Sequence, residues 1–182
     1  MNTDSQAVET RVRQWIQTVV LGLNLCPFAA QPYQNDRVRI VVSDACDEVA
    51  LLTELQLELT RLSETRAQEL ETTLIAIPHF LQDFLDYNDF LDQVDALLEH
   101  YEWDGEFQVA SFHPQYQFEG TTADDRENYT NRAPLPLLHL LREDSVEAAI
   151  ASHPNPEGIP LANIRRLQGL TPAQWQALFG GA

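Results

Sequence analysis

The sequence predicts an α/β fold: a small three-layer sandwich with a three-stranded, mainly parallel sheet and extra helices at both ends. Three short apolar runs, at residues 37–44, 73–78 and 107–112, alternate with two long segments of helical periodicity. Strands that alternate with helices are typical of parallel strands joined by right-handed crossovers. Uninterrupted apolar runs indicate strands that are covered on both faces.

In the first half of the chain, sequence patterns predict these elements one after another. Apolar side chains recur at helical spacing from Val8 to Val20, and Gly22 is well placed to end that helix. The first strand follows at 37–44. Asp44 can then cap a helix whose apolar stripe runs from Val49 to Leu62.

The second half continues the alternation and ends in short helices. Pro78 stops the second strand, and a helical period extends from Phe80 to Tyr101 before the third strand. A long polar loop follows. Beyond it the sequence predicts short helices at 135–142, 145–151 and 171–179, the last with Thr171-Pro172 as cap and first residue.

The chain length and the net charge limit the kinds of protein that this sequence can encode. A chain of 182 residues predicts a single domain, 1–182, with a proper core. The net charge of −17 argues against nucleic-acid partners and anionic membranes, because phosphate binding needs clustered cations. No apolar run reaches the roughly 18 residues of a membrane span, and two cysteines are too few for a disulfide scaffold. We therefore expect a cytoplasmic protein without membrane contact.

The residue types present exclude several kinds of chemistry. The chain has no lysine, so all 11 basic residues are arginine. This excludes Schiff-base catalysis, a Walker-type phosphate loop and a lysine general base. The G-x-G-x-x-G pattern of dinucleotide sites is also absent. The sequence thus indicates no particular cofactor, and it does not define an oligomeric state.

A ligand site is expected at the carboxyl ends of the strands, where open parallel sheets bind ligands. Two of the three strands deliver a histidine to that edge, His79 and His113, and the polar loop starts there. On the helix expected at 135–142, His139 and Arg142 share a face. The predicted catalytic residues are His113, His139 and Cys26, and the predicted ligand-binding residues are Arg132, Arg142, Asn128, Asn131, Asp125 and Tyr116.

Each of these residues also has a structural interpretation. His79 and His113 can simply cap strand ends, and Cys26 can be a buried, inert thiol. Asn128 and Asn131 can form turns, because Asx side chains bond their own backbone. The arginines can pair with acids instead of a ligand; the acids in reach by sequence are Asp124, Asp125 and Glu143.

Four separated motifs resemble one known family. They are GLNLCPFA, IPHFLQDFLDYNDFL, QVASFHPQYQF and NYTNRAPLPLLHLLRE. Together they resemble an uncharacterised bacterial family, the one numbered 1415 among the domains of unknown function. The resemblance spans nearly the whole chain and implies a single domain of this size. It lends no catalytic assignment.

Three hypotheses about function follow from the residues. The first is an enzyme that acts on a small anionic molecule, with arginine clamps and histidine, aided by Cys26, as acid–base or nucleophile. The second is a mononuclear metal site that uses His113 and His139 with Cys26 or Asp125. The third is a non-catalytic interaction module whose acidic surface binds a basic partner.

Overall fold

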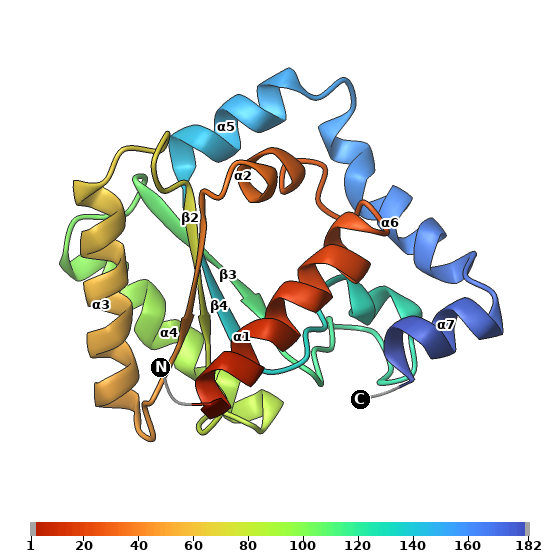
Figure 1. The fold of residues 1–182 in the computed structure, drawn as a ribbon, viewed down its shortest axis with the longest axis horizontal. Coiled ribbons are helices and arrows are strands. Elements are labelled where there is room, and N and C mark those ends of the chain that lie inside the picture. The colour runs from red at the N-terminus through yellow and green to blue at the C-terminus, as the bar shows by residue number, and fades with distance from the viewer. Residues whose placement is uncertain (1–2, 181–182) are drawn as a thin grey trace.

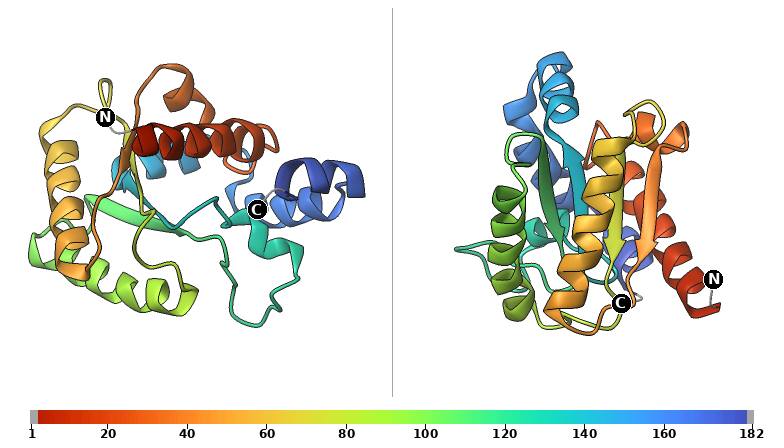
Figure 2. Two further views of the ribbon diagram at one scale, coloured as in Figure 1. Left: turned by 60° about the horizontal axis from the view of Figure 1, so that its bottom comes forward. Right: turned by 90° about the vertical axis from the view of Figure 1, so that its left-hand side faces the viewer.

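The computed structural model describes residues 3–180 and shows a mixed α/β fold in three layers (Figure 1). A four-stranded sheet lies in the middle. Helices α3 and α4 cover one face, and α1 lies on the other (Figure 2). The elements are α1 Thr3–Trp15, η1 Ile16–Leu21, α2 Ala30–Gln34, β1 Val38–Val42, α3 Glu48–Glu64, β2 Thr72–Ala76, α4 Phe84–His100, β3 Phe107–Phe112, η2 Arg126–Thr130, β4 Leu137–Arg142, α5 Glu143–Ser152, η3 Pro156–Gly158, α6 Ile159–Gln168 and α7 Pro172–Phe179.

The sheet has the strand order β1-β2-β4-β3. β1 and β2 are parallel, whereas β4 runs antiparallel to both of its neighbours, β2 and β3. The three predicted strands therefore do share one direction, but the prediction of a three-stranded, mainly parallel sheet is wrong. A fourth strand lies between the second and the third, and the sheet is mixed.

The fourth strand is the segment that was expected to form a helix at 135–142. Leucine favours helices, and two prolines in front of it suggested a helix start. In the structure Leu137, Leu138 and Leu140 are completely buried, because β4 is an interior strand with helices near both faces. A strand that is buried on both faces has a continuous apolar sequence. A short apolar sequence of this kind is equally compatible with a buried helix, so it does not identify the element.

The layer formed by α3 and α4 packs its apolar faces on β2, β3 and β4. α3 begins at Asp47, whose side chain accepts a hydrogen bond from the amide of Ala50 at 2.8 Å. The predicted cap, Asp44, lies three residues too early. Asp83 caps α4 in the same way through the amide of Leu85. Both helices therefore begin at the carboxyl edge of the parallel strands.

The opposite layer combines the N-terminal helix with the C-terminal helices. Val12 and Ile16 pack on the β1–β2 part of the sheet, and the helix ends at Gly22 as predicted, after a π-helical turn. α7 begins with the predicted Thr171 cap, here a full capping box. α6 was not predicted. Among residues 3–180 no helix is both long and apolar enough to cross a membrane.

Candidate functional site

His113 follows β3 at the carboxyl edge and is completely buried. The amide of Gln115 donates to its Nδ1 at 3.0 Å, so Nε2 carries the proton and donates to the carbonyl of Leu81 at 3.2 Å. Burial lowers the pKa of His113, which favours this neutral tautomer. Its ring packs against Phe84 and Tyr87. Nε2 thus ties the end of β3 to the loop before α4, whereas Nδ1 fixes the turn that follows β3.

Tyr87 lies in the core and binds backbone groups at the same edge of the sheet as His113. Its hydroxyl donates to the carbonyl of Leu137 at 2.7 Å and accepts from the amide of Phe112 at 3.1 Å. Leu137 and Phe112 are paired in the β3–β4 register, at the end of that ladder. Tyr87 therefore satisfies two backbone groups at the point where the sheet stops, and burial raises its pKa.

The polar loop between β3 and β4 is held together by its own side chains. Asn128 is completely buried, accepts hydrogen bonds from the Phe118 amide and the Thr121 hydroxyl, and donates to the Thr122 carbonyl. Asp125 accepts from the amide of Thr122 at 2.7 Å. Asn128 and Asp125 thus bond groups of the loop that lie 3 to 10 residues earlier in the chain.

Asn131 and Arg132 close the loop at its far end. Asn131 donates to the carbonyl of Ser111 at 3.2 Å, which ties the loop back to β3. Arg132 donates to the carbonyls of Tyr116 and Ala123 at 3.1 and 2.7 Å, and its guanidinium lies 4.4 Å from the centre of the Tyr129 ring. Arg132 thus bonds carbonyls rather than a carboxylate. The ring of Tyr116 packs between those of Phe84 and Phe118.

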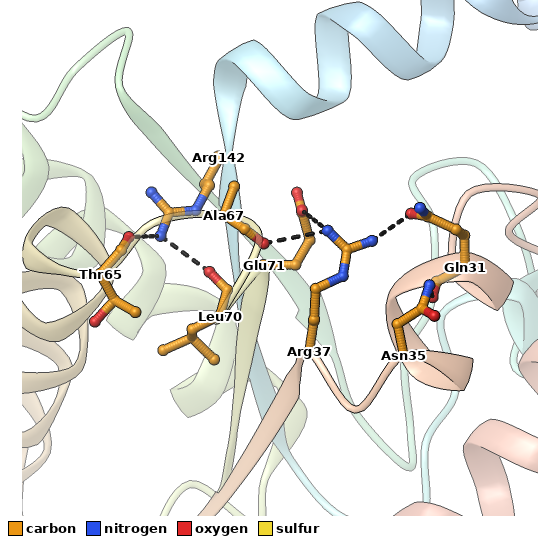
Figure 3. A network of polar contacts seen from close by, with 8 residues as sticks. All are labelled: Gln31, Asn35, Arg37, Thr65, Ala67, Leu70, Glu71 and Arg142. Carbon is orange, nitrogen blue, oxygen red and sulfur yellow. Dashed lines mark hydrogen bonds and ion pairs between the residues drawn. The ribbon is translucent and has the colours of Figure 1, made fainter.

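Arg142 lies at the opposite edge of the sheet from His113, because β4 runs antiparallel to β3 and Arg142 pairs with Phe107, the first residue of β3. Its Nη2 donates to the carbonyls of Leu62, Thr65 and Leu70, at 2.7, 2.6 and 3.0 Å. Figure 3 shows the bonds to Thr65 and Leu70. These carbonyls belong to the end of α3 and the loop before β2. Arg142 therefore neither pairs with Glu143 nor lies near His113.

Cys26 lies in the turn after η1, and α6 holds that turn in place. Asn163 donates to the carbonyl of Leu25 at 2.6 Å, and Arg166 donates to that of Asn24 at 2.8 Å. Burial raises the pKa of the Cys26 thiol, while bonds from the amides of Phe28 and Ala29 oppose that shift. The thiol form is thereby favoured at neutral pH.

The metal hypothesis requires several ligands in one place. Within residues 3–180, no group of three or more histidine, cysteine, aspartate or glutamate side chains is placed to hold a metal ion. The structure therefore does not assemble His113, His139 and Cys26 or Asp125 into a ligand set.

One side of the sheet is left partly open over β3 and β4. Leu140, which faces α3 and α4, is fully buried. On the α1 side, His139 and Leu141 are partly exposed, and so are their partners in β3, Ala110 and Gln108. Opposite residues in neighbouring strands share a face. We call these four side chains the open face.

His139 occupies the centre of the open face and differs from His113 in its bonding. Its Nε2 is buried and has no hydrogen-bond partner in the described part of the chain. Burial lowers the pKa of His139 to about 4, so the imidazole is neutral at pH 7. The ring of Phe112 lies 6.2 Å away, and Trp15 packs edge-on against Phe112. This is a neutral imidazole beside an aromatic wall.

The sequence matches a known family over residues 7–177, under the description "Protein of unknown function (DUF1415)". The chain belongs to this family. No curated protein matches it, and no solved structure does. Membership of the family confirms the resemblance drawn from the four motifs, and it brings no activity with it.

Three of the four residues of the open face are not among the site residues predicted from the sequence. Gln108, Ala110 and Leu141 carry no chemical signal of their own, and they come together with His139 only through the β3–β4 register. With 135–142 read as a helix, no such register could be drawn. The segment FQVASF has no regular alternation that would show two different faces of β3.

The position of Arg142 predicts a large effect on stability. We expect Arg142→Met to lower the free energy of unfolding by about 2–4 kcal/mol, since the partly buried carbonyls at the end of α3 and in the loop after it lose the Arg142 donor. Arg142→Lys should lose only about 1 kcal/mol, because a single nitrogen makes all three bonds and an ammonium offers three donors. Urea unfolding measures both.

Arg11→Met, at an exposed position of α1, is the matched control and should be neutral. A loss below about 0.5 kcal/mol for Arg142→Met would show that the carbonyl bonds do not stabilise the fold.

His113 allows a second test with a matched control. His113→Phe keeps an aromatic ring but leaves the Leu81 carbonyl and the Gln115 amide unpaired, so we expect a loss of about 2–3 kcal/mol. His79→Phe makes the same change at the exposed histidine after β2 and should be nearly silent. Equal effects of the two substitutions in thermal or urea unfolding would refute the assigned role of His113.

Proposed function

We propose that this chain binds a small molecule on the open face and that His139 is the residue that recognises it. The observation that carries the proposal is the buried, unpartnered Nε2 of His139 in the middle of a central strand. Buried polar atoms are nearly always paired, because an unpaired one costs about 1–3 kcal/mol. A ligand that completes this hydrogen bond accounts for the exception.

The setting supports a small, partly apolar ligand. Phe112 and Leu141 offer apolar contact near the imidazole, and the side chain of Gln108 offers an amide donor and acceptor. Pockets for small molecules typically combine apolar walls with a few convergent polar groups. A neutral imidazole can accept a hydrogen bond from a ligand O–H or N–H, or donate one to a ligand oxygen or nitrogen, and this is the recognition that the open face provides.

The proposal keeps the histidine of the enzyme hypothesis and leaves out its arginine clamps. Arg132 and Arg142 bond backbone carbonyls, and Arg142 lies at the far edge of the sheet. His113 uses both ring nitrogens internally. Nothing near His139 therefore favours an anionic ligand over a neutral one.

Binding is tested by screening small aromatic and heteroaromatic compounds against the protein at pH 7, with ligand-observed NMR and thermal shift. We expect hits that raise the melting temperature of wild type and lose at least tenfold in affinity in His139→Leu, equivalent to about 1.4 kcal/mol. His100→Leu, on the exposed end of α4, is the control. Hits that bind His139→Leu as tightly as wild type would refute the site.

The neutral state of His139 is tested without any ligand. The unfolded chain binds a proton at this residue below about pH 6.5, whereas the folded protein resists it down to about pH 4. The free energy of unfolding should therefore be highest above pH 6.5 and fall by roughly 3 kcal/mol as the pH drops to 4.

His139→Leu removes this contribution, so its unfolding free energy should depend less on pH over the same interval, whereas His100→Leu should follow wild type. Parallel pH profiles for wild type and His139→Leu would show that His139 is already protonated, or solvated, in the folded state.

A further inference from the structure

Acidic charge is concentrated in one continuous part of the chain. Residues 67–125 contain 14 acidic side chains and no arginine or lysine. This segment forms β2, α4 and β3 and runs into the polar loop. The charge is therefore placed on the α4 side of the molecule rather than spread evenly, and it produces a local negative field.

The outer face of α4 carries a regular row of carboxylates. The row consists of the exposed residues Asp83, Asp86, Asp89, Asp92 and Asp95. The first two lie near the helix N-terminus, where the helix dipole favours negative charge. Asp92 and Asp95 lie in the second half, where like charges three residues apart destabilise a helix. Within residues 3–180, none of these five forms an ion pair with an arginine.

An apolar hollow lies beside the N-terminal end of this row. It has a volume of about 580 Å³ and is lined by Asp47, Glu48, Val49 and Ala50 at the start of α3 and by Phe80 from the loop before α4. α3 and α4 are packed against each other and begin at the same edge of the sheet (Figure 2). The lining of the hollow thus combines apolar side chains with two acidic ones.

Two exposed apolar side chains mark this place as unusual for a charged surface. Val49 is 75% exposed and Leu85, in the first turn of α4, is 70% exposed. One turn along α3 from Ala50, on the same helical face, the Oε2 atom of Glu54 is buried without a hydrogen-bond partner. The exposed apolar groups favour an occupant that supplies apolar contact, and the acidic residues Asp47 and Glu48 of the lining favour one that also supplies a donor.

We propose that the hollow and the outer face of α4 form one docking surface for a basic segment of a partner protein. An apolar side chain of the partner lies in the hollow between Val49 and Phe80, and its arginine or lysine side chains pair with the carboxylates of α4. Charge complementarity selects this occupant: a second copy of the chain carries the same −17 charge and is repelled, as are nucleic acids.

This surface is independent of the ligand site proposed above. It lies on the α3–α4 side of the sheet, whereas His139 faces the α1 side. Arginine and lysine side chains of the partner speed up its association and orient it, because they are attracted by the negative electrostatic field around α4. The apolar side chain that the partner buries in the hollow provides most of the selectivity. The two contributions can therefore be separated by experiment.

The test uses fluorescent peptides of about 12 residues at low salt. One is rich in arginine with a central phenylalanine, a second has serine in place of the phenylalanine, and a third has glutamate in place of the arginines. We expect the first peptide to bind wild type about tenfold or more tightly than the second, and the third not to bind. Adding salt to 0.5 M should weaken binding of the first peptide.

Variants locate the site. Val49→Ser should reduce affinity for the first peptide to that of the serine peptide, and Asp92→Asn with Asp95→Asn should weaken both basic peptides. The matched controls are Leu57→Ser, another exposed apolar position on α3, and Glu147→Gln on α5. These should bind as wild type does.

The proposal is overturned if the phenylalanine makes no difference, because the hollow then takes no part. It is also overturned if Val49→Ser and Leu57→Ser behave alike, or if no basic peptide binds at low salt. Circular dichroism of each variant separates a lost site from a lost fold. Binding that is unchanged in His139→Leu would confirm that the two sites are separate.

Discussion

The guanidinium of Arg142 joins segments that are 72 to 80 residues apart in the chain. It stands at the end of β4 and bonds the last turn of α3 and the loop that enters β2. Of these carbonyls, that of Leu62 also accepts from the amide of Thr65 at 3.2 Å, whereas Arg142 is the donor to those of Thr65 and Leu70. The Arg142 side chain thereby fixes the end of β4 and the end of α3 relative to each other. Figure 3 shows Arg37 holding the other side of the same loop.

The same use of arginine recurs elsewhere in the structure. Arg126 donates to the carbonyls of Leu167, Gln168 and Leu170 at the end of α6, and Arg166 bonds the turn that contains Cys26. A chain without lysine uses the planar, multi-donor guanidinium to satisfy backbone at helix ends and loops. Polar residues that looked available to a ligand are bound within the protein.

The sequence predicted the alternation of strands and helices, the edge at which the two large helices begin, and the place of His113 after β3. It could not predict the insertion of β4, because Leu137 and Leu138 are buried on opposite faces and their pattern has no helical or strand period. The wrong assignment of residues 135–142 as a helix also changed the expected positions of His139 and Arg142. His139 and Arg142 share a face of a helix, but on a strand three residues apart they point to opposite sides of the sheet. The open face depends on the register, which the sequence alone does not show.

The insertion of β4 also sets the order in which the protein can fold. β2 and β3 are formed from residues 72–112 but have no hydrogen bonds with each other; each pairs with β4, which is made later in synthesis. Until residue 142 has left the ribosome, β2 has an unpaired edge and β3 has no partner at all. Completion of the sheet therefore waits for a contact between Thr72 and Leu140, where the threonine hydroxyl bonds the leucine carbonyl. Such distant pairing slows folding and leaves the nascent chain dependent on protection from aggregation.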